Sequence, residues 1–312
     1  MTHADDGLVS HAPPGADDLA SAVVAAEARI AAAGPEYGDP GALRRDLAGW
    51  QECDLGRWML CNRGWDGYWT RYCIGYDRDP DEATNEVEHF FLTRSPAILA
   101  TRERYGIFHG LLSDHVTTGS VALSVPCGLL EDLLSLPGAA DADALIGVDL
   151  DRAALAAAAD NAAAHGLTHR CTLAVADAWR LTDAEVVLGD VSVYSTAVGQ
   201  RVDVLTSNGL NIYVGDDSRV LDLYRSFHAA LRPGGVLIAS ALTPPTHWDL
   251  GDMTEADLTR ARGLNLINDV MWANYRTPET TRDQLEAAGF TRVEKYPDSR
   301  GIFPTFVARA RL

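Results

Sequence analysis

Basic residues are scarce in this chain, and long apolar runs are missing from it. Its 312 residues contain 26 Lys and Arg against 44 Asp and Glu, which gives a formal net charge of −18, and Lys295 is the only lysine. Because phosphate backbones are bound by concentrated Lys and Arg, the composition argues against a nucleic-acid partner. No run is long and apolar enough to span a membrane, so we expect no membrane partner either.

Paired cysteines and metal-ligand spacings are missing as well. The five cysteines are scattered and form no Cys-x-x-Cys pair: Cys53, Cys61, Cys73, Cys127 and Cys171. This pattern predicts reduced thiols rather than disulfides or a zinc site, and the histidines offer no metal-ligand spacing. Because the acidic N-terminus leads into no secretory segment, we expect a cytoplasmic protein. The shortage of lysine beside abundant Ala and Arg indicates a GC-rich bacterial genome.

What the chain does contain is enough apolar sequence for a substantial core, at 47% of its residues. The patterns divide it into three regions. Residues 1–15 have the composition of a flexible leader, and residues 16–116 that of a helical cap or lid region. Residues 117–312 alternate strand and helix patterns, which predicts an α/β domain.

The cap region combines helices with one strongly aromatic segment. Its helices are expected over 16–33, 40–62 and 83–112, the last restarted or kinked at Pro96. Between them, glycines interrupt the segment Asn62–Tyr76, which predicts a loop or a short helix. Its side chains either tie the cap helices to the core or form a lid over a cationic ligand and its acceptor, and both interpretations stay open. The lid candidates are Tyr68, Trp69, Arg71 and Tyr72.

The α/β region begins with two units of strand, turn and helix. The run Val121–Gly128 is apolar and broken by Pro126 and Gly128, and helical spacing follows it over 129–136. A second strand, Ala144–Asp149, leads into a helix over 152–164 that Asp151 is suited to cap. Asp149 comes ~20 positions after the glycine turn, where doubly wound folds place an acidic residue that binds ribose hydroxyls.

Further strands follow in the same alternation. They are expected at Cys171–Asp177 and Val202–Asn208, and after a helix over 218–231 the stretch Leu231-Arg-Pro-Gly-Gly235 predicts a turn and a buried strand. A helix from Pro278 to about Ala288, ended by Gly289, and two strands over 291–296 and 303–310 close the chain. Strand carboxyl ends carry the ligands in open α/β sheets. Ser207, Asn208, Asn211 and Tyr213 are therefore expected to line a pocket.

These motifs resemble class I S-adenosylmethionine (SAM) dependent methyltransferases over about Thr117–Leu312. The resemblance rests on Leu-Arg-Pro-Gly-Gly before an apolar strand, the acidic ends of the second and third strands, and Ala-Ala-Gly-Phe290 before the last strand pair. It implies a doubly wound, mostly parallel seven-stranded sheet with an antiparallel last strand. It also implies SAM as cofactor, with Asp149 on the ribose and Asp177 on the adenine amino group. The neighbouring residues expected at the cofactor are Pro126, Cys127, Gly128, Leu150, Ala178 and Trp179.

The first turn departs from the pattern of that family. Where the family has Asp-x-Gly-x-Gly-x-Gly, this chain has Ser124-Val-Pro-Cys-Gly-Leu-Leu130 and keeps one glycine of three. Leu129 and Leu130 would bring side chains where glycines let the backbone approach the cofactor. SAM carries no phosphate, however, and a sulfonium needs carboxylates and aromatic faces more than a helix N-terminus. The turn can therefore change, and Glu131 or Asp132 is expected to face the methionine amino group.

Three functions remain open. The leading one is a SAM-dependent methyltransferase acting on a small, neutral or cationic acceptor, with Asn211 near the reaction and His247 or Asp249 as the base if one is needed. The alternative moves or cyclises the aminocarboxypropyl arm, as azetidine-2-carboxylate synthases do, and releases methylthioadenosine. The third is a SAM-fold binding module without catalysis. The acceptor, the alkylated atom and the oligomeric state stay open, a homodimer being one expectation because helices appended to this fold often cover a neighbour's pocket.

Overall fold

The computed structural model describes residues 16–76, 85–183 and 202–311. The chain divides into two compact units. Unit 1 takes in Met1–Arg102, as far as it is described, together with Asp249–Ala273; unit 2 takes in Glu103–Trp248 and Asn274–Leu312. The first boundary thus falls inside helix α6 (Pro96–His115), and not at residues 116/117 where the sequence patterns change.

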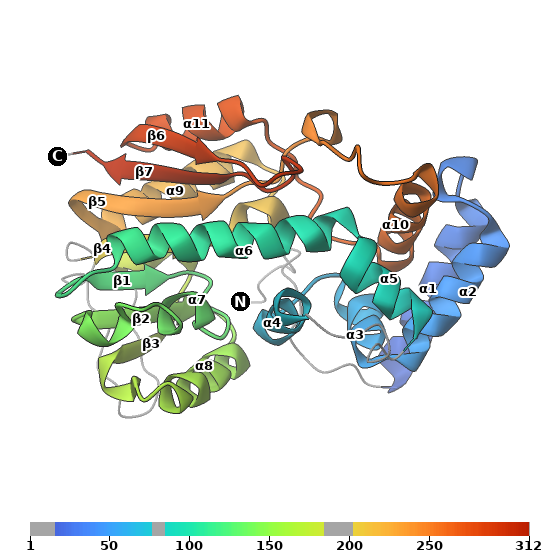
Figure 1. Cartoon of the computed structure of the whole chain (residues 1–312), viewed down its shortest axis with the longest axis horizontal. Coiled ribbons are helices and arrows are strands. Elements are labelled where there is room, and N and C mark those ends of the chain that lie inside the picture. Colours follow the sequence, from blue (N-terminus) through green and yellow to red (C-terminus); the bar gives the residue numbers. More distant parts are fainter. Residues whose placement is uncertain (1–15, 77–84, 184–201, 312) are drawn as a thin grey trace. The chain divides into compact units, whose positions relative to one another are not determined.

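A seven-stranded sheet in the described part of the chain forms the centre of unit 2 (Figure 1). Its order is β3-β2-β1-β4-β5-β7-β6, in which all neighbours are parallel except those of β7, which runs antiparallel to both β5 and β6. This confirms the predicted doubly wound sheet. The strands are β1 (Val121–Ser124), β2 (Ala144–Asp149), β3 (Cys171–Val175), β4 (Val202–Ser207), β5 (Leu231–Ser240), β6 (Phe290–Tyr296) and β7 (Thr305–Ala310).

Helices bury both faces of this sheet. One face packs against α6, α7 (Glu131–Leu134) and α8 (Arg152–Ala164), in a cluster that includes Phe108, Leu133 and Leu155. The other face packs against α9 (Asp217–Ala230) and α11 (Pro278–Ala287), through side chains such as Phe227 and Leu285. Apolar side chains on both faces explain why the central strands are continuous hydrophobic runs. Short 3-10 turns link several elements: η3 (Ala139–Asp141), η4 (Thr168–Arg170), η5 (Ala178–Asp183), η6 (Leu210–Tyr213) and η7 (Pro245–His247).

Local capping explains where the predicted helices begin. The Asp151 side chain accepts the Ala153 N–H at 2.9 Å, so α8 starts where the sequence predicted it. Thr277 caps α11 in the same way, ahead of Pro278 at its first position. The structure also shortens or interrupts some predicted elements. The helix expected over 129–136 is the single turn α7, and the Pro-Gly-Gly stretch lies within β5 at a register shift opposite Val202 and Val204.

Unit 1 is made of helices from two separate stretches of the chain. They are α1 (Ala16–Ala32), α2 (Pro40–Glu52), α3 (Asp54–Asn62), α4 (Gly67–Gly75), α5 (Glu86–Arg94) and α10 (Glu255–Asn268), with the short turn η1 (Pro35–Tyr37). Arg29 on α1 donates to the carbonyls of Leu266 and Ile267 at 2.9 and 2.6 Å, which fixes the end of α10 on α1. The segment 249–273 therefore packs with the N-terminal helices.

Two helices predicted in unit 1 are divided. The stretch 40–62 breaks at Cys53, whose backbone is extended, because Gly56 lies so close to the Trp50 carbonyl that a side chain would clash with it. The stretch 83–112 restarts at Pro96, as expected, after the extended Ser95. The aromatic segment forms α4, one of the two outcomes predicted for it. None of the helices in the described part of the chain is long and apolar enough to cross a membrane.

Candidate functional site

The carboxyl ends of four parallel strands bring most of the predicted site residues of unit 2 to one edge of the sheet. Strands β3, β2, β1 and β4 are neighbours, so the segments that follow them meet at this edge. The strand order reverses direction between β1 and β4, which is where open α/β sheets bind their ligands. The turn after β1, Asp149 at the end of β2, Asp177 after β3 and Asn208 after β4 all belong to this edge.

Asp149 is buried, with 8% of its surface exposed, and its carboxylate is oriented by the backbone. One oxygen accepts the Gly128 N–H at 3.0 Å and the other accepts the Asp151 N–H at 3.1 Å. These contacts fix the orientation of the carboxylate at the position where doubly wound folds bind ribose hydroxyls. The next residue, Leu150, is apolar yet 50% exposed, which suits contact with a flat apolar ligand such as a purine.

The turn after β1 keeps a glycine-like backbone although two of its glycines are replaced. Gly128 has φ +48°, and Leu130 has φ +57°, in the left-handed region that favours glycine. The Leu130 side chain is fully buried in the core beneath the turn, so it does not stand between the backbone and a ligand. That corrects the expectation for Leu130. The turn begins with a cis Val125–Pro126 peptide.

Cys127 is a packing residue of the same turn. Its side chain is buried, and burial raises the pKa of its thiol well above the usual range, with the negative charges of Asp149 and Asp132 acting in the same direction. The thiol therefore stays protonated at neutral pH and is unsuited to act as a nucleophile. Gly147 on β2 makes room for it, because a β-carbon there would lie 3.0 Å from the Cys127 sulfur. All five cysteines are free.

The two carboxylates expected near the methionine end differ in where they point. The Ser124 hydroxyl, at the end of β1, donates to Asp132 at 2.9 Å. Burial raises the pKa of the Asp132 carboxyl to about 6, against the opposing effect of that hydrogen bond. Glu131 instead accepts the Asn161 side-chain amide at 2.8 Å, on helix α8. Asp132, on α7, thus places its carboxylate against Ser124 at the end of β1, where the resembled family carries its aspartate.

On the β3 side, Asp177 is exposed and Ala178 is buried behind it. The Asp177 carboxylate accepts the Trp179 backbone N–H at 3.0 Å. The Trp179 indole donates to the Arg219 carbonyl at 2.7 Å, and the Arg219 guanidinium lies 5.2 Å from the centre of its ring. These contacts hold Trp179 in place beside Asp177 and leave the carboxylate open to solvent.

On the β4 side, Ser207 and Asn211 are buried, while Asn208 and Tyr213 are partly buried. The Asn211 amide donates to the Tyr224 hydroxyl at 2.9 Å, inside the unit. The Asn211 carbonyl in turn accepts from the buried Arg276, which also binds Asp217 and the Val214 carbonyl, both at 2.7 Å. Asn211 thus has a structural task, and its part in catalysis stays a prediction. Arg276, which sequence reasoning missed, fixes η6 to the start of α9.

The two candidate bases are both exposed, and they belong to different units. His247, at the end of η7, is in unit 2, and Asp249 is in unit 1. The Asp249 carboxylate accepts the Gly251 N–H at 3.2 Å, as in a tight turn. Their roles as bases stay predictions.

The lid candidates lie on α4 in unit 1, and the three aromatic ones contact one another edge to face. The ring of Trp69 lies 5.0 Å from that of Tyr68, 5.4 Å from that of Tyr72 and 6.4 Å from that of Trp58. The Tyr72 hydroxyl donates to Glu88 at 3.2 Å, whereas Tyr68 is 60% exposed and Arg71 is exposed. Within this row, Trp69 and Tyr72 have packing partners and Tyr68 presents its ring to solvent.

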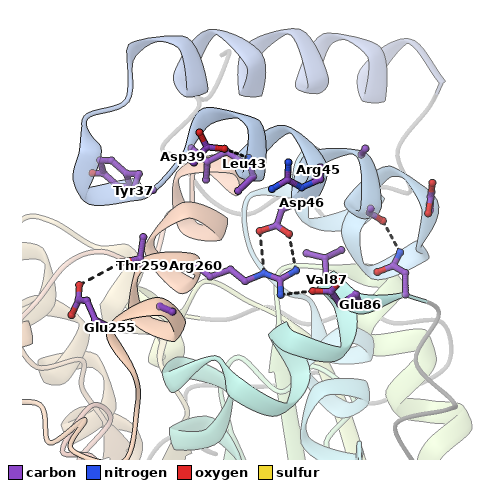
Figure 2. Close-up of a pocket in the computed structure, with 17 residues that line it drawn as sticks. Tyr37, Asp39, Leu43, Arg45, Asp46, Glu86, Val87, Glu255, Thr259 and Arg260 are labelled. Atoms are coloured by element: carbon purple, nitrogen blue, oxygen red, sulfur yellow. Dashed lines mark hydrogen bonds and ion pairs between the residues drawn. The ribbon is translucent and has the colours of Figure 1, made fainter.

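Unit 1 also contains a groove of about 790 Å³ between α2, the start of α5 and α10 (Figure 2). None of the predicted site residues lines it. Its central arginine, Arg260, pairs with Asp46 at 2.7 Å and with Glu86 at 2.9 Å, as Figure 2 shows. Arg260 thus joins α10 to α2 and α5 by ion pairs, which is a structural task within unit 1.

Comparison with known proteins gives both distant and nearer relatives. No family model and no curated protein matches the sequence. The structure is similar to that of a possible exported protein from Bordetella parapertussis, with 38% identity and a TM-score of 0.83 over 97% of this chain and 100% of that one. It is also similar to the CurJ carbon methyltransferase, at 13% identity and a TM-score of 0.52 over 88% and 72%.

An O-methyltransferase family protein from Burkholderia thailandensis matches at 12% identity and a TM-score of 0.50, over 85% of this chain and 71% of that one. At 12 and 13% identity, the two methyltransferase matches show a shared fold and no more than that. The sheet order, the acidic strand ends and the first turn described above agree with that fold. The chain belongs to the same family as the Bordetella parapertussis protein and has the fold of class I SAM-dependent methyltransferases.

Proposed function

We propose that the protein is a SAM-dependent methyltransferase that acts on a small-molecule acceptor. The observation that carries this proposal is Asp149, a buried carboxylate at the end of β2 whose two oxygens are oriented by the backbone N–H groups of Gly128 and Asp151. An acidic side chain at the end of the second strand, ~20 residues after the glycine turn, is where doubly wound folds bind ribose hydroxyls.

The residues present fit the cofactor along its whole length. Asp149 would hold the ribose, and the exposed Leu150 and Asp177 would contact the adenine face and its amino group. Asp132, on α7 beside the end of β1, would hold the methionine amino group. When bound, SAM supplies an electrophilic methyl group on a sulfonium. The residues of this chain orient the reactants and exclude water, which is the main contribution a protein makes to such a transfer.

The alternative, transfer or cyclisation of the aminocarboxypropyl arm, depended on a changed first turn. Because Leu130 adopts the left-handed backbone expected of a glycine and buries its side chain, the turn offers less reason for the arm to move. We therefore place methyl transfer first and keep the alternative as an outcome of the experiment. His247 is the proposed base for acceptors that need one, since it is exposed and follows β5.

The experiment that tests the proposal is incubation of the purified protein with SAM, with and without a pooled small-metabolite extract. S-adenosylhomocysteine formed only with extract supports methyl transfer to a diffusible acceptor. Methylthioadenosine identifies the alternative, and its formation without extract identifies cyclisation. Absence of SAM binding in calorimetry would refute both and leave a binding module for another ligand. Location in the cytoplasm is a separate proposal, to be checked by cell fractionation because the Bordetella relative bears the name of an exported protein.

A further inference from the structure

One face of the sheet changes from apolar to polar towards the carboxyl ends of β4 and β5. Residues in register on neighbouring strands share a face. Val204 pairs with Val236, and Ile238 pairs with Val307; with Phe108 and Leu112 of α6 they form part of one apolar cluster. The next positions along the same face are polar. They are Thr206 and Asn208 at the end of β4, Ser240 at the end of β5, and Thr305, which pairs with Ser240.

Arg104 covers this polar row. It lies one helical turn before Phe108 on α6, so its side chain continues the face that packs on the sheet. Its guanidinium contacts the Ser240 hydroxyl at 3.4 Å, and the Ser240 hydroxyl contacts the Asn208 side chain at 3.4 Å. The guanidinium also lies 4.5 Å from the centre of the Phe303 ring. Only 6% of the Arg104 surface is exposed.

The charge of Arg104 is poorly compensated within unit 2. Among the described residues, no carboxylate lies within ion-pair distance of it, and its Nε has no hydrogen-bond partner. Burial lowers the pKa of its guanidinium to about 10; Asp298 and Tyr213 oppose the change. The Asp298 carboxylate, however, already accepts the backbone N–H groups of Arg300, Ile302 and Phe303. A buried cation normally has a paired anion, because leaving it unpaired is costly.

Two hydroxyls on the same face of the sheet also lack hydrogen-bond partners among the described residues. Thr206 and Thr305 are fully buried, and the hydroxyl of each lacks a hydrogen-bond partner in the described part of the chain. One unpaired guanidinium and two unpaired hydroxyls thus lie on one face at the ends of neighbouring strands. A planar anion with two oxygens matches the fork of a guanidinium and can accept hydroxyl donors as well.

We propose that Arg104 binds a carboxylate of the acceptor, so that the substrate is a small carboxylic acid. This inference rests on the proposed methyl transfer. It differs from the expectation of a neutral or cationic acceptor, which was drawn from the net charge of the whole chain. The cofactor candidates lie after β1, β2 and β3, whereas Arg104 lies at the ends of β4 and β5, on the acceptor side of the sheet. The same chemistry exists in the methionine carboxylate of SAM, and the test separates the two sources.

The test uses the full-length protein, SAM with a deuterated methyl group, and a metabolite extract divided beforehand by anion exchange into a neutral-and-cationic fraction and an anionic fraction. The variants are Arg104→Met and Arg104→Lys. The matched control is Arg232→Met, which removes an exposed arginine paired with Asp203 at the opposite end of the strands. SAM affinity is measured by calorimetry, and melting temperature shows that each variant is folded.

With the wild type, the label is expected only in compounds from the anionic fraction. Arg104→Met should lower that labelling at least about tenfold, with SAM affinity within about twofold of wild type, because a charge-assisted hydrogen bond to the acceptor is lost. Arg104→Lys should recover part of the labelling, and Arg232→Met should leave it unchanged. Label in the neutral-and-cationic fraction, or anionic labelling unaffected by Arg104→Met, would overturn the inference. So would a loss of SAM affinity of tenfold or more, which assigns Arg104 to the cofactor. No labelling with undivided extract would instead refute methyl transfer itself.

Discussion

Replacing Asp132 by asparagine should make the protein more stable and its cofactor site weaker. Burial raises the pKa of the Asp132 carboxyl from 3.8 to about 6, and Ser124 donates a hydrogen bond to it. Asparagine has nearly the same shape and can accept that hydrogen bond, but it carries no charge. One pKa unit corresponds to about 1.4 kcal/mol, so ionised Asp132 destabilises the folded state by up to about 3 kcal/mol.

The sign of the effect fixes its pH dependence. The unfolded chain releases the Asp132 proton near pH 3.8, while the folded protein keeps it until about pH 6. The stability that the protonated carboxyl provides is therefore complete below pH 3.8 and is lost as the pH rises through 6. The Asp132→Asn variant lacks this loss. Its gain in unfolding free energy over wild type should be small at pH 4. Above pH 7 the gain should reach at most about 3 kcal/mol.

Urea unfolding followed by circular dichroism at several pH values between 4 and 8 measures this gain. Asp160→Asn is the matched control, because Asp160 is exposed on α8 and its replacement should leave stability within about 0.5 kcal/mol at every pH. Calorimetry at pH 7.5 should show SAM binding at least about tenfold weaker in Asp132→Asn, because a cationic amino group loses its carboxylate. A gain that does not grow with pH would refute the burial argument. Unchanged SAM affinity would refute the assignment to the methionine end.

Four further replacements test other parts of the site. Asp149→Ala should lower the unfolding free energy by about 2 to 4 kcal/mol as well as abolish SAM binding, because the Gly128 and Asp151 N–H groups lose their acceptor; a fully stable variant would show that these contacts carry little energy. Trp69→Ala should cost about 1 to 3 kcal/mol in urea unfolding through lost ring packing. Tyr68→Ala should leave stability unchanged and lower turnover if α4 acts as a lid. His247→Ala should leave the melting temperature unchanged and lower turnover about a hundredfold; normal turnover would remove His247 as the base.

The alternation of strands and helices in unit 2 was predictable because short sequence motifs mark where the helices begin and end. Asp151 caps α8 at the predicted residue, and Pro278 and Gly289 mark the two ends of α11. Helix α10 was not predicted, although Thr254 and Asp257 form a capping box that the sequence displays. The break at Cys53 offers no such signal, since it follows from the close approach of Gly56 to the Trp50 carbonyl.

Within the site, strand ends could be predicted and side-chain partners could not. The spacing between Gly128 and Asp149 predicted that Asp149 ends the strand next to the glycine turn, and its hydrogen bond from the Gly128 N–H agrees with that position. The contact between Ser124 and Asp132 depends on the path of the chain from the end of β1 into the single-turn helix α7. No pattern of residue types predicts that path. Arg104 did leave a signal, because it lies four and eight positions before Phe108 and Leu112, on the apolar side of its helix. A charged residue on an apolar helix face is a reason to look for its partner.

The interleaved boundaries of the two units have a consequence for synthesis on the ribosome. Helices α1 and α3 pack against α10, so the helical unit cannot be completed until Asn268 has emerged, after most of the sheet has been translated. The sheet in turn waits for β7, which lies between β5 and β6. The helical unit is therefore completed only after β5 has been translated, and the sheet only when β7 has emerged, so nascent helices α1 to α3 lack α10 over a long stretch of synthesis. For the same reason, removal of residues 1–116 would strip α6 from the sheet and leave α10 without its partners, so the α/β unit cannot be isolated by an N-terminal deletion.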